Sequence, residues 1–175
     1  LFRAIGKRAG FEVVFENTPF DGASAGLDTG AFDAVISAMT ITAERSERFL
    51  FSDPYYKAGQ AVAVREDEAA ISGFGDLGGR KIGVQLGTTG AMKAQEVPDA
   101  DITEYDTINL AFMALGNGTV DAVINDEPTS RAIAATRGGF RLVGETLTEE
   151  QYGIAMRKDA HELGRRINLA LAEIK

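Results

Sequence analysis

The chain has 175 residues, of which 45% are hydrophobic and 25% are charged, the composition of an ordinary globular protein. Its 26 acidic residues against 18 basic ones give a net charge of −8, which argues against binding to nucleic-acid phosphates. No apolar run reaches the roughly 20 residues of a membrane span, and no signal segment opens the chain. With no cysteine and a single histidine, disulfides, thiol chemistry and multi-histidine metal sites are excluded, and we expect neither metal nor cofactor.

The spacing of the apolar residues and the positions of the glycines predict alternating helices and strands over the first 65 residues. Gly10 and Gly30 are expected to end helices, and Thr42 is expected to cap a third, short helix. In chain order we expect a helix over 1–9, a strand over 12–16, a helix over 20–27, a strand over 32–37, a helix over 42–47 and a strand over 60–65.

A second series follows the polar stretch 66–75, and Pro128 is expected to open one of its helices. Because strands alternate with helices, we expect an α/β protein with a mainly parallel sheet, flanked by helices, in each half. The expected elements are a strand over 81–85, a helix from 91, a helix over 107–115, a strand over 120–125, a helix over 128–136, a strand over 140–144, the segment 152–156 and a helix from 160.

Two segments repeat one pattern: GAFDAVIS over 30–37 and GTVDAVIN over 118–125, each after a predicted helix. Units of one helix and one strand converge on such patterns, so an ordinary αβ repetition stays open. The alternative is two similar lobes whose polar strand ends, 37–40 and 125–127, face each other across one cleft. Ligands of open α/β sheets bind beyond the carboxyl ends of the strands, which favours this alternative.

The segment from Thr40 to Arg45 combines two hydroxyls and a guanidinium at the start of a helix that follows a strand. Helix starts favour negative charge, and arginine can hold a carboxylate through two parallel hydrogen bonds. The segment therefore predicts a site for a small anion, and a threonine cap beside a solvated arginine is the alternative.

The loop Gly87-Thr88-Thr89-Gly90 also lies between a predicted strand and a helix, so its N–H groups could point at an anion. It lacks both the Gly-Lys-Ser/Thr of a phosphate loop and the spacing of a dinucleotide site. Nucleotide binding is therefore disfavoured, and an ordinary αβ turn is the alternative.

Asn125, Asp126 and Glu127 precede Pro128 at the end of a predicted strand. One carboxylate could hold an ammonium group, and the alternative is that it caps the helix that Pro128 opens. An anion site in one half and a cation site in the other are what the carboxylate and ammonium of an amino acid require. Together the two sites predict binding of a free amino acid.

The sequence resembles the extracytoplasmic solute-binding proteins of polar amino acid ABC transporters, family 3, the type of the glutamine and the lysine/arginine/ornithine binders. The resemblance runs along the whole chain in five segments, 33–45, 51–57, 76–90, 120–126 and 151–155. It implies a hinged, two-lobed periplasmic-binding-protein-like fold of type II. Lobe 1 would comprise residues 1–59 and 152–175, and lobe 2 residues 60–151.

The resemblance also implies how the ligand carboxylate is bound. Residues matching the family's carboxylate binders are expected in both lobes. They are Arg45 and Thr40, the backbone of Ser37 and Ala38, and Thr88 or Thr89.

By the same matching, Asp126 would bind the ligand's ammonium group and Phe20 would pack on its side chain. Gln85 and Asn125 lie at positions where the family varies. They are therefore expected to tune the choice towards a polar uncharged or a basic amino acid.

Both chain ends lie inside helical patterns, and the family's first strand and its C-terminal segment have no counterpart in this sequence. We therefore expect a truncated chain with an incomplete lobe 1. An unpaired sheet edge and a smaller core would weaken ligand binding or favour a dimer through that lobe.

The function that the resemblance implies is binding of a free polar L-amino acid and its delivery to an ABC transporter permease, with no catalysis. It implies a periplasmic or an extracellular, lipid-anchored location, with the signal peptide removed. Two alternatives share the fold: an enzyme of the cyclohexadienyl dehydratase kind, with Asp126 or Glu127 as its acid, and the sensor domain of a receptor.

Overall fold

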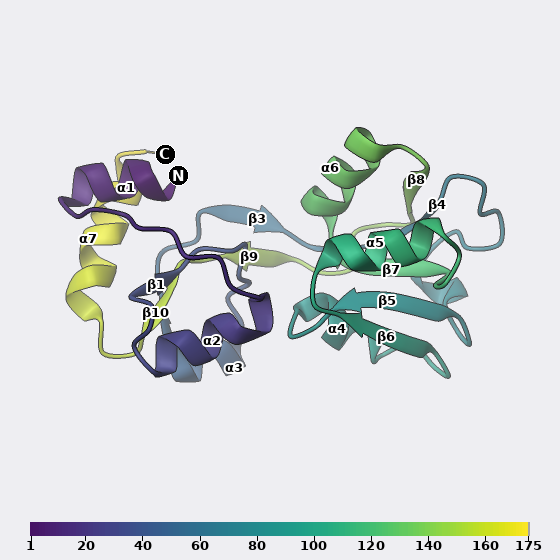
Figure 1. Ribbon diagram of the computed structural model, residues 1–175, viewed down its shortest axis with the longest axis horizontal. Coiled ribbons are helices and arrows are strands. Elements are labelled where there is room, and N and C mark those ends of the chain that lie inside the picture. The colour runs from purple at the N-terminus through teal and green to yellow at the C-terminus, as the bar shows by residue number, and fades with distance from the viewer. Residues whose placement is uncertain (175) are drawn as a thin grey trace. The chain divides into compact units, whose positions relative to one another are not determined.

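The computed structural model describes residues 1–174, and the chain divides into two units (Figure 1). Unit 1 consists of Leu1–Lys57 and Gln151–Lys175, and unit 2 of Ala58–Glu150. The chain therefore passes from unit 1 into unit 2 and returns. At these two passages, strands β3 (Tyr56–Ala58) and β9 (Glu150–Tyr152) pair with each other.

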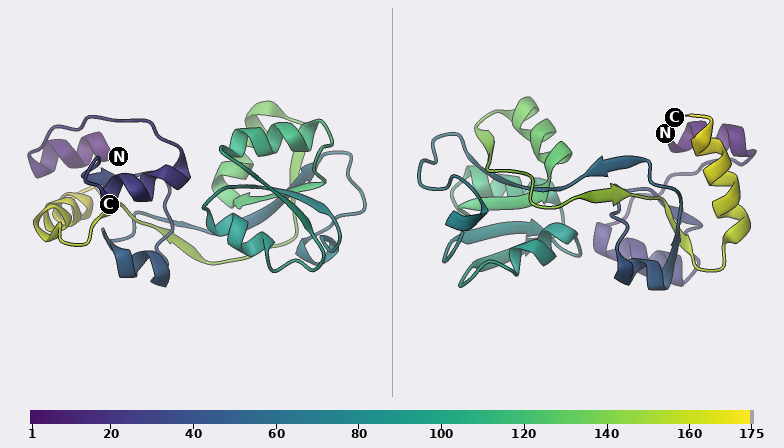
Figure 2. Two further views of the ribbon diagram at one scale, coloured as in Figure 1. Left: turned by 60° about the horizontal axis from the view of Figure 1, so that its bottom comes forward. Right: turned by 180° about the vertical axis from the view of Figure 1, so that it is seen from behind.

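Unit 1 is built on a sheet in which a strand from late in the chain lies between two early strands. β10 (Ala155–Arg157) pairs antiparallel with β1 (Ala34–Val35) on one side and with β2 (Phe49–Phe51) on the other. The first helix, α1, and the last helix, α7, lie side by side, as Figure 1 and Figure 2 both show. The helices are α1 (Phe2–Ala9), α2 (Phe20–Asp28), α3 (Ala43–Arg48) and α7 (His161–Ala172).

Unit 2 contains a five-stranded sheet of order β6-β5-β7-β4-β8. β5 is parallel to β6 and β7, whereas β4 is antiparallel to β7 and β8. Helix α4 packs against the core on one face of the sheet, and α5 and α6 pack on the other. The elements are β4 (Gln60–Arg65), η1 (Phe74–Asp76), β5 (Lys81–Gln85), α4 (Thr89–Ala94), β6 (Asp101–Tyr105), α5 (Ile108–Gly116), β7 (Ala122–Asp126), α6 (Glu127–Arg137) and β8 (Phe140–Val143).

The prediction of a mainly parallel sheet in each half is wrong. Both pairings in the unit 1 sheet are antiparallel, and so are two of the four in unit 2. Alternating helices and strands suggest that each strand pairs in parallel with the one before it. That expectation fails here because β10 joins the unit 1 sheet only after the chain has returned from unit 2, between strands that run the other way.

The predicted strand over 12–16 is also wrong. Residues 11–19 belong to no helix or strand, and no segment within residues 1–174 pairs with them. Val14 is 84% exposed and Phe15 is 54% exposed. Apolar and β-branched residues favour a strand only where a neighbouring strand supplies hydrogen bonds, so composition alone overestimated strand formation here.

Most other predicted elements are confirmed with small shifts at their ends. The strands over 60–65 and 81–85 coincide with β4 and β5, whereas the strand expected over 32–37 is reduced to β1. α4 begins at Thr89 instead of residue 91. The sequence did not predict β6, whose residues alternate little and are mostly exposed.

The two repeated segments fold alike. The N–H of Gly30 donates to the carbonyl of Leu27 at 3.1 Å, and the N–H of Gly118 donates to the carbonyl of Leu115 at 3.2 Å. Both glycines have a left-handed conformation, with φ of 71° and 77°, which glycine adopts without steric cost. The repeat is thus a shared helix ending that leads into β1 in unit 1 and β7 in unit 2.

Candidate functional site

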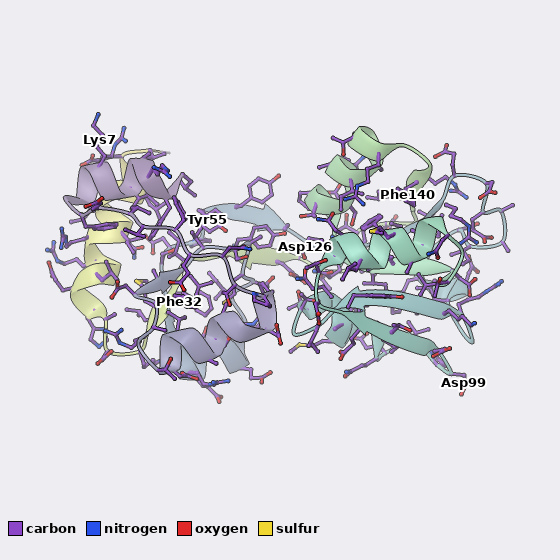
Figure 3. All side chains as sticks on the ribbon, in the orientation of Figure 1. Lys7, Phe32, Tyr55, Asp99, Asp126 and Phe140 are labelled. Carbon is purple, nitrogen blue, oxygen red and sulfur yellow. The ribbon has the colours of Figure 1, made fainter. Side chains whose placement is uncertain are left out.

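The expected binding residues of unit 2 lie at one end of its sheet. β5 and β7 run parallel, so their last residues, Gln85 and Asp126, lie at the same edge. α4 begins at this edge and places Thr88 and Thr89 there. Figure 3 labels Asp126 at this end of the sheet and Asp99, which precedes β6, at the opposite end.

Asp126 is the N-cap residue of α6, but its side chain makes no capping hydrogen bond. Its Oδ1 accepts a hydrogen bond from Nε2 of Gln60, the first residue of β4. Gln60 and Asp126 are partners in the antiparallel β4–β7 ladder, so their side chains lie on the same face of the sheet. Side-chain capping, the alternative that the sequence left open, is therefore not the role of this carboxylate.

Further polar side chains extend this contact. Thr89 Oγ1 accepts a hydrogen bond from Gln60 Nε2 at 3.1 Å and donates to Glu150 Oε2 at 3.0 Å. Thr148 Oγ1 donates to Glu150 Oε1 at 2.9 Å and accepts the backbone N–H of Gln60 at 2.9 Å. Gln60 is fully buried and Glu150 is 9% exposed. We call this set the Gln60 network: Gln60, Thr89, Asp126, Thr148 and Glu150.

Sequence reasoning missed Gln60, Thr148 and Glu150. One signal was available for Gln60, because it is the polar first residue of a strand whose next four residues are all buried and apolar. Such a side chain is buried together with its polar atoms and needs partners. Glu150 follows another glutamate in a polar segment, where no pattern distinguishes it from an exposed residue.

The two threonines of the loop before α4 have different roles. Thr88 is the N-cap of α4: its hydroxyl accepts the N–H of Ala91 at 3.2 Å and donates to the carbonyl of Gln85 at 2.7 Å. Thr89 belongs to the Gln60 network. The side chain of Gln85 donates to the carbonyl of Asp106 at 3.2 Å. Thr88 therefore shapes the turn, and Thr89 faces the carboxylates.

Asn125 lies on the opposite face of β7 from Asp126, since successive side chains of a strand alternate. It is 8% exposed, and its Nδ2 donates to Oγ of Ser130, a fully buried residue of α6, at 3.1 Å. Its amide thus joins β7 to α6. The expected role of Asn125 in ligand choice stays a prediction.

In unit 1 the structure brings Phe20, Thr40 and Arg45 together. Arg45 Nη1 donates to the carbonyl of Thr40 at 2.9 Å, and its guanidinium carbon lies 5.6 Å from the centre of the Phe20 ring. The N–H of Arg45 donates to Oγ1 of Thr42 at 3.1 Å, which confirms the expected cap of α3. The half-buried guanidinium is thus held by a carbonyl and an aromatic ring, a favourable position for a cation.

Ser37 and Ala38 form the turn that leads from β1 towards α3. Ser37 is exposed, whereas Thr40, at the end of the turn, is 5% exposed and forms a β-bridge with Tyr152. Ala38 has a φ of 51°, a left-handed conformation that is uncommon for a residue with a side chain. Such strained backbone is found preferentially at ligand-binding turns.

Within residues 1–174, no group of three or more histidine, cysteine, aspartate or glutamate side chains is placed so that it could hold a metal ion. No helix in this range has the length and apolar character needed to cross a membrane.

The sequence profile of a family described as bacterial extracellular solute-binding proteins, family 3, matches residues 1–175. The ABC transporter arginine-binding protein 1 of Escherichia coli K12 is 35% identical, over 100% of this chain and 74% of its own length. The ABC transporter glutamine-binding protein GlnH of Bacillus subtilis 168 is 34% identical, over 85% of this chain and 55% of its own length. This chain therefore spans about half to three quarters of these relatives.

Solved structures of arginine-binding proteins are closely similar. Holo ArgBP from T. maritima is 38% identical, with a TM-score of 0.94 over 98% of this chain and 76% of that chain. An ancestral arginine-binding protein bound to arginine is 40% identical, with a TM-score of 0.95 over 99% and 79% of the two chains. An ancestral arginine-binding protein bound to glutamine is 41% identical, with a TM-score of 0.91 over 99% and 78%. The chain therefore has the periplasmic-binding-protein-like fold.

Proposed function

Because the chain belongs to the bacterial extracellular solute-binding proteins, family 3, we propose that it binds one free polar L-amino acid through residues of both units. Arg45 and Thr40 of unit 1 take the ligand carboxylate, and Asp126 of unit 2 takes the ammonium group. The observation that carries the proposal is the position of the Asp126 carboxylate, at the end of β7 and the start of α6, where Gln60 Nε2 holds it. A carboxylate placed in this way suits an ammonium ligand.

The remaining expected residues complete the proposed site. Phe20 holds the Arg45 guanidinium and also packs on the ligand's side chain, since an aromatic ring can stack on both faces. The backbone of Ser37 and Ala38 contributes N–H donors for the carboxylate. In unit 2 the proposed contacts are with Thr88 or Thr89, and Gln85 and Asn125 influence which side chain is accepted.

L-arginine is the first ligand to test, and L-glutamine is the second. The names of similar proteins and structures support this order, because both amino acids occur among them and arginine occurs more often. Both have the polar side chain that was expected from the sequence.

The proposal includes delivery of the ligand to the membrane permease of an ABC transporter. It places the protein outside the cytoplasmic membrane, in the periplasm or on a lipid anchor, in keeping with the family's description.

The proposal also includes a dimer through unit 1, supported by the edge position of β1 and the exposed Val14 and Phe15. Light scattering after size exclusion tests the dimer.

The amino acid proposal is tested by a thermal-shift screen with the 20 common amino acids, followed by calorimetry. A ligand that binds only the folded state stabilises it by about 2.7 kcal/mol at 100 times its Kd, so a polar amino acid should raise the Tm by several degrees. Arg45→Ala should abolish the shift. Arg165→Ala, which removes an exposed arginine on α7, should leave it unchanged. A screen in which no amino acid raises the Tm would overturn the proposal.

A further inference from the structure

We infer that Gln60 is a positioning residue for ligand binding, which holds the Asp126 carboxylate and the Thr89 hydroxyl in place and is itself anchored by Glu150 in the chain's returning segment. The inference rests on the proposed function, because it assumes that Asp126 binds the ligand's ammonium group. Gln60 is fully buried, so in this structure it can act on a ligand only through its neighbours.

The amide nitrogen of Gln60 is the centre of the network. It has two hydrogens and three acceptors within reach: Asp126 Oδ1, Thr89 Oγ1 at 3.1 Å and Glu150 Oε2 at 3.3 Å. The amide oxygen, Oε1, is buried and has no hydrogen-bond partner within residues 1–174. An unpaired buried oxygen lowers the stability of the fold. Because Oε1 makes no hydrogen bond, the orientation of this amide is set by the hydrogen bonds of its nitrogen.

The backbone around Gln60 is tightly held. Its N–H donates to Thr148 Oγ1, and its carbonyl accepts the N–H of Leu147 at 2.7 Å. On the side of α4, a β-carbon at Gly90 would lie 2.8 Å from Gln60 Oε1 and 2.9 Å from the carbonyl of Ile124. The amide therefore has little room to move, and the groups bonded to its nitrogen share its position.

The charges of the network explain why such an anchor matters. The carboxylates of Asp126 and Glu150 both accept hydrogen bonds from the same nitrogen, so two like charges lie close together. Without the amide between them the carboxylates would repel each other and Asp126 could turn away. A hydrogen bond to an ammonium group depends on direction, so a displaced carboxylate would bind it more weakly.

Gln60→Met tests the inference, because methionine keeps the length of the side chain and removes its hydrogen bonds. Calorimetry with L-arginine is compared with binding of 5-guanidinopentanoate, which lacks only the α-ammonium group and is followed by ligand-observed NMR. We expect about tenfold weaker binding of L-arginine and less than about a twofold change for the analogue. Gln95→Met, at an exposed glutamine of unit 2, should change neither. If the wild type binds L-glutamine instead, glutaramate is the matching analogue.

If Gln60→Met weakens the binding of both compounds equally, Gln60 has only a structural role. If it leaves the binding of L-arginine unchanged, Gln60 has no role in binding. Either result overturns the inference. A wild type that binds no amino acid overturns the proposed function itself, and the two failures are thus distinct. If Gln60→Met does not fold by circular dichroism, Gln60→Asn replaces it. That variant keeps an amide but shortens the side chain by one methylene, so its nitrogen no longer reaches Asp126 Oδ1. It should likewise weaken L-arginine binding but not binding of the analogue.

Discussion

At the scale of single residues, Asn125 and Asp126 are neighbours with different surroundings. Asn125 is buried beneath α6 and bonded to Ser130, whereas Asp126 faces Gln60 on the other side of the sheet. The family resemblance predicted both as ligand residues, Asp126 for the ammonium group and Asn125 for the choice of side chain, and the sequence places them together at a strand end. The alternation of side chains along β7 separates them, so substitutions at these two positions should have different effects.

Replacing Asn125 by leucine should lower the stability of the protein. The hydroxyl of Ser130 is fully buried and would lose its bond from Asn125, which costs about 1–3 kcal/mol in the free energy of unfolding. Urea denaturation measures this loss. The double variant Asn125→Leu, Ser130→Ala should recover part of it, because both polar partners are then gone. Equal stabilities of the single variant and the wild type would contradict the prediction.

Which site residues could be predicted depended on whether their partners are near in sequence. The cap formed by Thr42 and the position of Arg45 follow from a local motif, and both were expected from residues 40–45. Gln60 could not be found in the same way. Its contact with Asp126 exists because β4 pairs antiparallel with β7, across 66 positions of the chain, and the sequence predicted parallel sheets.

At the scale of elements, the two segments where the chain passes between the units approach closely at Gly59. A β-carbon at this position would lie 2.0 Å from the carbonyl oxygen of Thr148 and 2.4 Å from Cγ2 of Thr146. The backbone bond from Leu147 N–H to the carbonyl of Gln60 holds the two segments at this distance, and the N–H of Glu127, at the start of α6, donates to the carbonyl of Gly59. A side chain would force them apart, so glycine is required here.

Gly59→Ala should therefore destabilise the protein by about 1–3 kcal/mol, the usual cost of overpacking a tight site. Gly75→Ala is the matched control, because a β-carbon at Gly75 meets nothing within 4 Å. Chemical denaturation of the two variants, with the wild type, gives the comparison. If Gly59→Ala were as stable as Gly75→Ala, the close approach would not constrain the passages.

Elements were predicted well where the signal is contained in the element itself. The segment 81–85, with Ile82 and Val84 at its centre, and the glycine after α1 are such signals, and β5 and α1 were found with errors of at most one residue. The strand over 12–16 fails for the opposite reason, because strand formation depends on a partner that local composition does not reveal. For the same reason the sequence marked the segment 152–156 but did not reveal that β10 pairs antiparallel with β1 and β2.

At the scale of the whole molecule, the proposed site draws its anion contact from unit 1 and its cation contact from unit 2. Arg45 belongs to Leu1–Lys57, and Asp126 belongs to Ala58–Glu150. A ligand with both an α-carboxylate and an α-ammonium group can bind to both units at once. A ligand with one of these groups can bind strongly to one unit only, so the two groups together would link the units.

L-arginine should therefore reduce the radius of gyration of the protein in solution, measured by small-angle X-ray scattering at saturating ligand. Agmatine lacks the carboxylate and 5-guanidinopentanoate lacks the ammonium group, so neither should produce the full reduction at the same concentration. In Arg45→Ala the effect of L-arginine should disappear, since the anion contact of unit 1 is lost. An unchanged radius in the wild type at saturation, with binding confirmed by calorimetry, would show that one unit holds the ligand alone. Binding to both units therefore makes a specific demand. The reduction of the radius of gyration must require the carboxylate and the ammonium group of L-arginine and also the guanidinium of Arg45.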